Sequence, residues 1–369
     1  MKILLAGDYS NYHRALSLAL RRMGHEVVVA SDGSQWMNTA RDIDTSRPFK
    51  NKVGGLLLWA KLNMLLKSRL EGFDVVQINS PGFVALQPCR LRLLFDHLLA
   101  RNGAVYLTAM GTDTYYIDFC LSGALRYNEW RVGNQPSPLA LAQPDELRRW
   151  QAPVLTDYTH YVYDRVRGIV SGLYEYNESC RRVVDSSRLA YAGIPIDTDS
   201  FTMAHGDEVP SRVRLFLGVH RDRMVEKGTD RMWAAARRVA ERHPDKCELV
   251  FVENRPYSEY VGLMRSSHVV LDQLYSYTPA TNALLAMAQG LVAVSGAEPE
   301  YYDFIGETEN RPIVNAIPDD EKLETQLEDI VLHPERLPEQ ARRSREFVVK
   351  HNRDEVVARR FLDFWARCK

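Results

Sequence analysis

A lysine directly before a glycine marks the part of the sequence best suited to bind an anion. Lys227 precedes Gly228 and the helical pattern 229–242, so its ammonium is expected beside the free backbone N–H groups at a helix start. The loop upstream follows a predicted strand that ends at Gly218 and carries more cationic side chains: His220, Arg221 and Arg223. At the carboxyl end of a strand these groups would converge on one diphosphate. The alternative is a solvated basic loop.

A second candidate anion site is the turn 277–282, which leads into an apolar helix predicted at 283–288. Thr281 or Asn282 would cap this helix or offer hydroxyl and amide donors, and Thr278 lies in the same turn. The free N–H groups of the first helical turn would hold the second phosphate. An ordinary helix cap is the alternative, but the turn lies only one predicted strand away from Lys227.

The first half of the chain offers candidates for an acceptor site. Asp113 follows a predicted strand at 104–108, where it would orient a sugar or accept a proton from an attacking hydroxyl. Gly111 would let the backbone turn sharply past a ligand. The alternative for Asp113 is an Asx turn or a helix cap. Asn11 and His13, in and after the first loop, are secondary candidates, because a lone histidine at a helix start is commonly structural.

Alternating strands and helices must position these residues. The first half reads as an open, largely parallel sheet with strands near 2–6, 27–29, 73–78, 104–108 and 168–171. After the polar stretch 204–211 a second α/β region has strands predicted at 214–218, 248–253, 268–272, 291–295 and 313–314. Its helices are predicted at 229–242, 258–266 and 281–289, and the tail 321–368 reads as helices only. Two doubly wound domains bind ligands at the carboxyl ends of their strands, the arrangement of a two-substrate transferase.

Composition excludes several classes of protein. The 369 residues carry 47 basic and 48 acidic side chains, which gives no global electrostatic reason to bind nucleic acid. The five cysteines never occur as CxxC, so neither a disulfide framework nor a zinc knuckle is indicated. No apolar run reaches the length of a signal peptide or a membrane span. We expect a cytoplasmic protein, with a position at the inner face of the membrane as an alternative.

Several segments together resemble the GT-B glycosyltransferases, specifically the retaining group known as family four or glycosyl transferase group one. The resembling segments are the opening 1–30, the stretch 193–201 against "nGvDtdrF", 226–230 against "eKGxd", 260–272, and 286–290 against "EAMAxG". The resemblance implies an α/β GT-B fold of two Rossmann-like doubly wound domains facing across a cleft. It assigns 1–203 to an acceptor domain, 204–350 to a nucleotide-sugar donor domain, and 351–369 to a helix packing back on the first domain.

The chain departs from this family at its usual Glu-x7-Glu signature. The two positions are Tyr277 and Leu285 here, and an apolar side chain cannot accept a ribose hydroxyl. Glu298 or Glu300, directly after the next predicted strand, would enter the same cleft as a substitute. An exposed acidic loop is the alternative.

The resemblance implies a hexosyltransferase-type enzyme of polysaccharide or glycoconjugate biosynthesis that transfers a sugar with retention from a nucleotide-sugar to a hydroxyl of a glycan or lipid-linked saccharide. Lys227 with Arg221 would stabilise the leaving diphosphate, and domain closure would bring Asp113 toward the donor sugar. No cofactor and no divalent metal are expected, since no DxD-like metal motif lies in a suitable place: 42–44 matches the pattern but lies in a polar loop of the first domain. Replacing Lys227 by Ala is expected to remove most transfer activity while leaving the melting temperature nearly unchanged.

Two other functions remain open: a catalytically inactive GT-B-like protein that binds a nucleotide or glycan, which the missing Glu pair favours, and a nucleotide-sugar 2-epimerase. A further feature is the basic amphipathic stretch 47–70, which would lie on an anionic membrane surface. The alternative is a helix packed on the sheet with snorkelling lysines. The stretch is short and has few aromatic residues, which disfavours nucleic-acid binding.

Overall fold

The computed structural model describes residues 1–34, 37–253 and 255–368, which divide into two compact units. Unit 1 comprises Met1–Phe119, Asp145–Pro195 and the chain from Asp354 onward, and unit 2 comprises Cys120–Pro144 and Ile196–Arg353. The sequence analysis places the boundaries at 203/204 and 350/351. They fall instead at 195/196 and 353/354, where Ile196 forms a parallel bridge with Arg353 and donates its N–H to the carbonyl oxygen of Asn352 at 2.8 Å.

Unit 1 is built on a parallel seven-stranded sheet in the order β10-β9-β5-β4-β1-β2-β3. The strands are β1 (Lys2–Ala6), β2 (Glu26–Ser31), β3 (Ile43–Asp44), β4 (Val75–Asn79), β5 (Ala104–Ala109), β9 (Ile169–Ser171) and β10 (Leu189–Tyr191). The central strands are almost continuously buried, as expected for parallel strands covered on both faces. The two-residue strand β3 lies at one edge of this sheet, in a segment that the sequence analysis predicts to be a loop.

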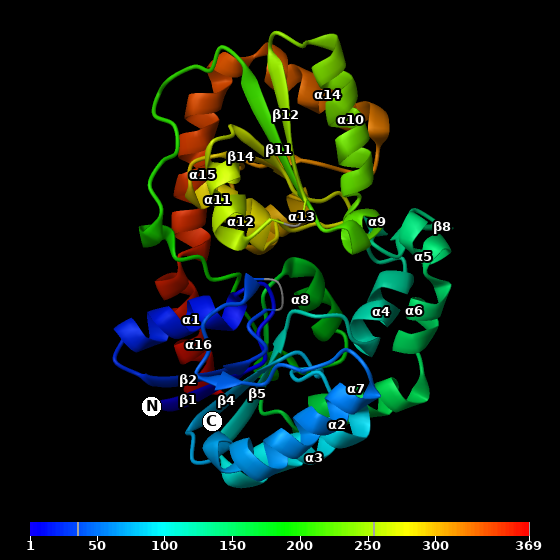
Figure 1. The fold of residues 1–369 in the computed structure, drawn as a ribbon, viewed down its shortest axis with the longest axis vertical. Coiled ribbons are helices and arrows are strands. Elements are labelled where there is room, and N and C mark those ends of the chain that lie inside the picture. Colours follow the sequence, from blue (N-terminus) through cyan, green and yellow to red (C-terminus); the bar gives the residue numbers. More distant parts are fainter. Residues whose placement is uncertain (35–36, 254, 369) are drawn as a thin grey trace. The chain divides into compact units, whose positions relative to one another are not determined.

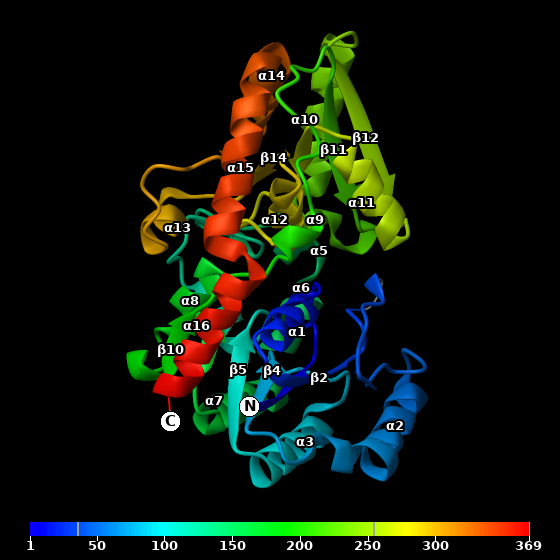
Figure 2. The ribbon, with the colours of Figure 1, turned by 90° about the vertical axis from the view of Figure 1, so that its left-hand side faces the viewer.

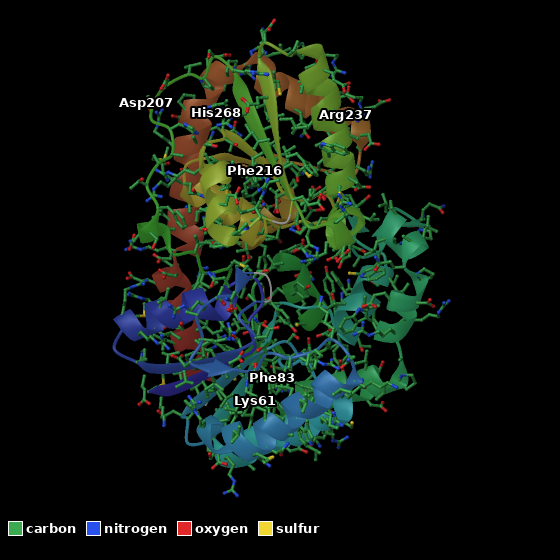
Figure 3. The ribbon with its side chains drawn as sticks, viewed as in Figure 1. Lys61, Phe83, Asp207, Phe216, Arg237 and His268 are labelled. Carbon is green, nitrogen blue, oxygen red and sulfur yellow. The ribbon has the colours of Figure 1, made fainter. Side chains whose placement is uncertain are left out.

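Helices cover both faces of the unit 1 sheet (Figures 1 and 2). One face is covered by α1 (Tyr12–Arg22) and α16 (Asp354–Arg367), where Tyr12 meets Phe361 and the indole N–H of Trp365 donates to Gln77 Oε1 at 3.0 Å. The other face is covered by α2 (Lys52–Lys61), α3 (Pro88–Arg101) and α7 (Pro153–Arg165), around a core that includes Phe83 (Figure 3). The remaining helices of this region are α4 (Thr114–Leu121), α6 (Pro144–Trp150) and α8 (Tyr174–Cys180).

Unit 2 is built on a parallel five-stranded sheet in the order β12-β11-β13-β14-β15. The strands are β11 (Val213–Val219), β12 (Cys247–Glu253), β13 (Val269–Leu271), β14 (Val292–Ser295) and β15 (Val314–Asn315), each within two residues of its prediction. The helices α10 (Thr229–Arg242) and α14 (Asp320–Leu332) cover one face. On the other face α11 (Tyr257–Arg265) and α12 (Thr281–Ala288) enclose Phe216 (Figure 3), and α15 (Leu337–Asn352) packs on α12.

The segment 120–144 belongs to unit 2 although the chain enters it from unit 1 and returns there. It forms three short antiparallel strands, β6 (Tyr127–Asn128), β7 (Arg131–Val132) and β8 (Gln135–Pro136), followed by α5 (Pro138–Ala142). Its residues Tyr127, Trp130 and Leu139 are buried. The sequence analysis assigns this segment to the first domain. Its contacts with unit 2 join residues far apart in the sequence, and local sequence patterns do not indicate such contacts.

Among the described residues, no helix is long and apolar enough to cross a membrane.

Candidate functional site

The carboxyl edge of the unit 2 sheet carries most of the predicted donor residues. Strand β11 runs into a 3₁₀ turn, η6 (Arg221–Arg223), and then into the one-turn helix α9 (Met224–Lys227). Gly228 ends α9 and starts α10 with φ +70°, a left-handed conformation that favours glycine, and an added Cβ would lie 2.9 Å from Leu274. This glycine therefore fixes Lys227 at the junction of the two helices.

Lys227 is held by a buried acid. Its Nζ lies 3.5 Å from Oδ1 of Asp272, which directly follows β13 and is fully buried, while Oδ2 of Asp272 accepts a hydrogen bond from Ser295 Oγ at 3.0 Å. The lysine side chain itself is 27% exposed. The ammonium is therefore fixed in position yet open to an incoming anion. Sequence analysis missed Asp272, although an acid at the end of a buried strand was a usable signal.

The other predicted cations do not gather around Lys227. Arg221 is exposed and pairs with Glu253 at the end of β12, with 2.7 Å between Nε and Oε1. Arg223 is also exposed, and its Nε donates to Glu226 Oε2 at 3.0 Å. His220 is exposed at the start of η6. Because ion pairs between exposed side chains are weak, an anion of higher charge can compete for both arginines.

Tyr260 connects two of the predicted donor residues. A Cβ on Gly218 would lie 2.3 Å from the Tyr260 hydroxyl, so the glycine makes room for this ring at the end of β11. The hydroxyl donates to Oδ1 of Asn282 at 2.7 Å. Burial and the nearby charge of Asp272 raise the pKa of Tyr260, so the phenol stays protonated. Tyr260 thus lies against Gly218, is hydrogen-bonded to Asn282 and is close enough to Asp272 to feel its charge.

At the second predicted anion site, the residue that precedes helix α12 is Ala280 and not a residue with a capping side chain. Ala280 is the N-cap residue of α12 and has no polar side chain, so neither Thr281 nor Asn282 caps the helix. Thr278 is buried in the preceding turn, where its N–H donates to Ser276 Oγ at 3.1 Å. No side chain of the N-cap residue therefore binds the backbone N–H groups in the first turn of α12. Free N–H groups of this kind are what a helix start needs to bind an anion.

Glu298 and Glu300 are bound by the segment 120–144. Arg126 Nη2 donates to Glu298 Oε2 at 2.7 Å and to Glu300 Oε2 at 3.1 Å, and the hydroxyl of Tyr127 donates to Glu298. The backbone N–H of Arg126 donates to the Tyr277 hydroxyl at 2.8 Å, and its guanidinium lies 5.1 Å from the centre of that ring. We call these five residues the clasp.

The clasp changes the interpretation of the missing Glu pair. Glu298 is buried and neutralised by Arg126, so it is neither a free ribose ligand nor part of an exposed acidic loop. Tyr277, at the first signature position, holds the backbone of Arg126. A cavity of about 410 Å³ borders the clasp and is lined by Arg126, Tyr127, Glu298, Asn315, Ile317, Pro318, Asp319 and Lys322. Tyr277 therefore helps to hold the segment 120–144 on unit 2.

In unit 1, Asp113 has the geometry of a helix cap. Its Oδ1 accepts from the N–H of Tyr116 at 2.9 Å, in the first turn of α4, and its Oδ2 accepts from the Tyr163 hydroxyl at 2.7 Å. The carboxylate is almost fully buried, and this burial raises its pKa to about 6. The structure favours the capping alternative, since both oxygens are engaged within the unit.

His13 also has a structural setting. Its ring is fully buried, Nδ1–H donates to the carbonyl oxygen of Gly7 at 2.7 Å, and Nε2 lies 3.4 Å from Thr108 Oγ1. Burial lowers the pKa of His13 to about 4, so the ring is neutral. Asn11 precedes α1 with φ +65° and donates its N–H to Ser34 Oγ at 3.0 Å.

Gly111 and two residues that sequence analysis missed lie at the same edge. A Cβ on Gly111 would come within 3.2 Å of Ser80 and 3.5 Å of Tyr9, so the loops after β1, β4 and β5 meet there. Asp8 accepts from the N–H of His13 at 2.9 Å, and burial raises its pKa to about 6. Asn79 ends β4, is fully buried, and has no hydrogen-bond partner for either side-chain polar atom among the described residues.

Comparisons with known proteins agree on the fold alone. No protein-family model matches the sequence, and no curated protein matches it. Among solved structures, Anabaena HepE in complex with UDP-glucose is 10% identical, with a TM-score of 0.61 and 99% of each chain covered. Sucrose-phosphate synthase from Thermosynechococcus elongatus is 12% identical, with a TM-score of 0.60, over 100% of this chain and 99% of the other.

A putative UDP-N-acetylglucosamine 2-epimerase from Listeria monocytogenes is similar to the same extent, at 12% identity and a TM-score of 0.58 over 98% of this chain and 94% of the other. These likenesses cover both parallel sheets and nearly the whole chain. The chain has the GT-B fold. The two GT-B units are Rossmann-like, as the sequence analysis predicts, and the fold places the candidate donor residues at the carboxyl edge of the second one.

Proposed function

We propose that the protein is a glycosyltransferase that moves a sugar from a nucleotide-sugar to a hydroxyl group. The observation that carries this proposal is the fixed, partly exposed ammonium of Lys227 at the carboxyl edge of the unit 2 sheet, together with the uncapped start of α12. The fold supports it, because HepE, a structural neighbour, was solved with UDP-glucose. Unit 2 is accordingly the donor-binding unit.

The donor chemistry follows from charge. When the bond between the sugar and the diphosphate breaks, negative charge develops on the leaving oxygen. Lys227 would stabilise that charge without reorganising, because Asp272 already holds its ammonium in place. Arg221 and Arg223, whose own side chains are exposed, would leave their half-buried acid partners and turn to the diphosphate, with His220, Thr278 and the Asn282 amide as further polar contacts. No resident cofactor or divalent metal takes part in this scheme, and retention of configuration follows the resemblance to family four.

Unit 1 would bind the acceptor, a hydroxyl of a glycan or a lipid-linked saccharide in polysaccharide or glycoconjugate biosynthesis. The loops that meet at Gly111 form the proposed acceptor edge, together with Asn11. Asp113 would act there as a positioning residue that fixes the start of α4, and His13 would fix the first loop. A cytoplasmic location fits such an enzyme.

Two further functions have support from particular observations. The likeness to the Listeria protein favours a nucleotide-sugar 2-epimerase. The clasp, which engages Glu298, and the apolar Leu285 favour a catalytically inactive protein that binds a nucleotide or a glycan. The transferase and the epimerase make different products, and the inactive protein makes none.

The deciding experiment measures the release of nucleoside diphosphate from UDP-, GDP- and ADP-sugars, with and without a pool of glycan and lipid-linked acceptors. Acceptor-dependent release is the expected result. Conversion of a UDP-sugar without any acceptor would establish the epimerase, and tight nucleotide binding without turnover would establish the inactive binding protein.

A further inference from the structure

The segment 49–65 exposes an unusual amount of apolar surface for one stretch of chain. Six large apolar side chains there are between 46% and 80% exposed: Phe49, Val53, Leu56, Leu57, Met64 and Leu65. Elsewhere in unit 1 the long helices α3 and α7 each expose a single one, Leu93 and Val154. Contiguous exposed apolar side chains mark a binding surface, whereas single ones do not.

These side chains are not needed for packing the helix on its unit. On α2 and the following turn η2 (Leu62–Leu66), the inner side is formed by Leu58, Leu62 and Leu66, spaced four residues apart and buried in the unit 1 core. Of the exposed set, Phe49 lies just before α2, and the other five side chains lie on α2 and η2, away from the buried ones. A helix that is apolar on both sides needs a second apolar environment.

The exposed face belongs to a stretch of chain that carries several cations, most of them without an ion pair among the described residues. Between 47 and 70 the sequence has no Asp or Glu and carries six cations: Arg47, Lys50, Lys52, Lys61, Lys67 and Arg69. Among the described residues, Lys61 is the one member of this group that forms an ion pair, with Asp44 at 3.1 Å. The exposed lysines 50 and 52 lie at the start of α2, next to Phe49 and Val53. Exposed apolar side chains next to exposed lysines match an anionic lipid surface.

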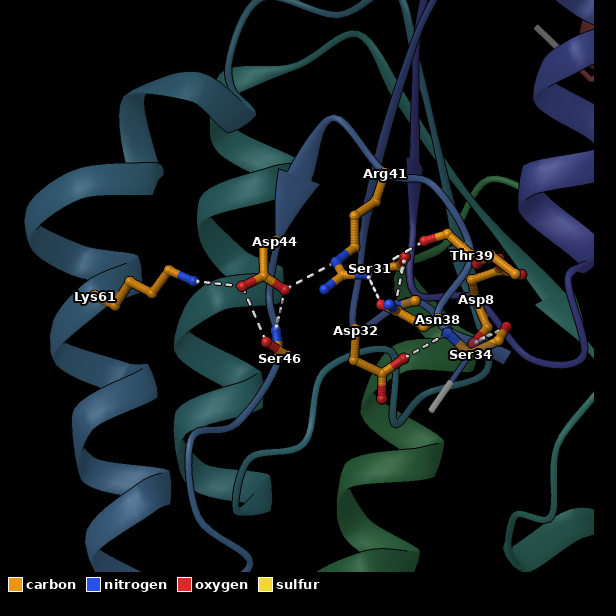
Figure 4. Close-up of polar contacts among 11 residues, drawn as sticks. Asp8, Ser31, Asp32, Ser34, Asn38, Thr39, Arg41, Asp44, Ser46 and Lys61 are labelled. Carbon is orange, nitrogen blue, oxygen red and sulfur yellow. Dashed lines mark hydrogen bonds and ion pairs between the residues drawn. The ribbon is translucent and has the colours of Figure 1, made fainter. Parts of the chain in front are cut away.

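Figure 4 shows how the helix is tied to unit 1. Asp44 of β3 accepts from Lys61 Nζ at 3.1 Å and from Arg41 Nε at 2.9 Å. Arg41 donates to the carbonyl oxygen of Thr39 at 3.2 Å, and Thr39 Oγ1 donates to Asp8 Oδ2 at 3.4 Å. These contacts run from α2 to the loop after β1, so the exposed face has a fixed place on the unit.

We propose that the face formed by the six apolar side chains and the surrounding cations binds the surface of an anionic lipid bilayer. The apolar side chains would enter the boundary between headgroups and acyl chains, and the cations would contact the lipid phosphates. A second copy of this face is disfavoured as the occupant, since two strongly positive surfaces repel each other. The proposal does not depend on glycosyl transfer, but it would place a lipid-linked acceptor near unit 1.

The test is flotation of the full-length protein with vesicles of phosphatidylcholine, with and without phosphatidylglycerol. We expect binding to the anionic vesicles that weakens as salt is raised, and little binding to phosphatidylcholine alone. Leu56→Ser/Leu57→Ser should weaken binding at least about tenfold with an unchanged melting temperature, because both side chains are exposed. The matched control is Leu141→Ser/Val154→Ser, which removes two exposed apolar side chains elsewhere and should bind like wild type.

Charge is tested separately with Lys50→Glu/Lys52→Glu, against Lys246→Glu as the control for an exposed lysine outside the face. Each cation near an anionic surface tightens binding about fivefold, so the double reversal should abolish flotation. Wild-type protein that stays unbound, or a Leu56→Ser/Leu57→Ser variant that binds equally well, would overturn the proposal. So would a concentration-dependent dimer in light scattering that the same variant dissolves, because the face would then join two copies of the chain.

Discussion

The carboxyl edges of the two sheets hold their ionisable groups in opposite ways. In unit 2 the cations are partly or fully exposed and paired with acids: Lys227 is fixed by Asp272, and Arg221 pairs with Glu253 at the surface. In unit 1 the corresponding groups are buried, and burial moves the pKa values of Asp8 and Asp113 up to about 6 and that of His13 down to about 4. Exposed cations that can exchange an acid partner for a phosphate suit a diphosphate, whereas the buried, hydrogen-bonded groups of unit 1 suit the positioning of loops around the hydroxyl groups of a sugar.

The largest effect is expected at Lys227. Lys227→Ala should lower the transfer rate about 100- to 1000-fold, the range seen when one group that stabilises a leaving charge is removed. It should also lower the melting temperature, because Asp272 would keep a buried charge without its partner. The sequence alone predicts a nearly unchanged melting temperature, and the buried partner Asp272 is the reason why the structure leads to a different prediction.

The double variant Lys227→Ala/Asp272→Asn separates the two effects. It removes both charges, so its melting temperature should return toward wild type while its rate stays low. Asp272→Asn alone keeps the ammonium but removes the acid that holds it, so it should lower the rate less than Lys227→Ala does. A double variant that recovers the rate together with the stability would show that Lys227 is structural.

The next largest effect is expected on stability, when the clasp is broken. Arg126→Ala should destabilise unit 2 by about 2–3 kcal/mol, because it leaves the buried Glu298 with the Tyr127 hydroxyl alone among its clasp partners. Denaturant unfolding measures the change, and Arg126→Ala/Glu298→Gln should recover part of it. Arg148→Ala, which breaks an exposed pair with Asp145, is the matched control and should be nearly neutral. Equal effects of the two arginine variants would refute the clasp.

Asp113 tests the unit 1 edge through pH. Because its folded pKa is raised, the folded state binds more protons than the unfolded state between about pH 4 and 6, so its contribution to stability falls as pH rises through that window. Asp8 acts in the same direction, whereas His13 opposes both. Asp113→Asn should therefore stabilise the protein by about 2 kcal/mol at pH 7 and have less effect at pH 4. Urea unfolding at the two pH values checks this, and a larger effect at pH 4 would contradict it.

The smallest change in stability is expected from a substitution at Asn79. Its buried amide has no hydrogen-bond partner among the described residues, so Asn79→Leu should raise the free energy of unfolding by about 1 kcal/mol. Gln77→Leu is the control at the same strand, since Gln77 is hydrogen-bonded to Thr108 and Trp365 and its loss should destabilise. Thermal unfolding of both variants measures the difference. A lower melting temperature for Asn79→Leu would show that the amide is satisfied in solution.

The sequence predicted the parts of this structure that depend on local pattern. Strand β11 and helix α10 were placed within two residues, because their apolar periodicity and the Lys-Gly junction are local signals. The position of Lys227 at a carboxyl edge followed from those elements. The partners of these residues could not be predicted in the same way. Asp272 lies 45 residues from Lys227, and Arg126 lies 172 residues from Glu298.

Asp113 shows the other limit. The sequence Gly-Thr-Asp fits both a sugar ligand and a helix cap, and local pattern does not distinguish them. Burial against Tyr163, 50 residues away, decided the geometry in favour of the cap. Similarly, the apolar residues of 47–70 read as one amphipathic stretch, and packing alone separated the buried Leu58 and Leu62 from the exposed Leu57 and Met64.

The central claim is that Lys227 holds the diphosphate of a nucleotide-sugar in unit 2. The most direct measurement is calorimetric titration of uridine, guanosine and adenosine diphosphates into wild type, Asp272→Asn and Lys227→Ala/Asp272→Asn. We predict that one of these nucleotides binds wild type and Asp272→Asn with similar affinity, and binds the double variant at least about tenfold more weakly, since a charge-assisted contact to phosphate is lost. Equal affinity for all three proteins, or no binding of any nucleotide to wild type, would contradict the account.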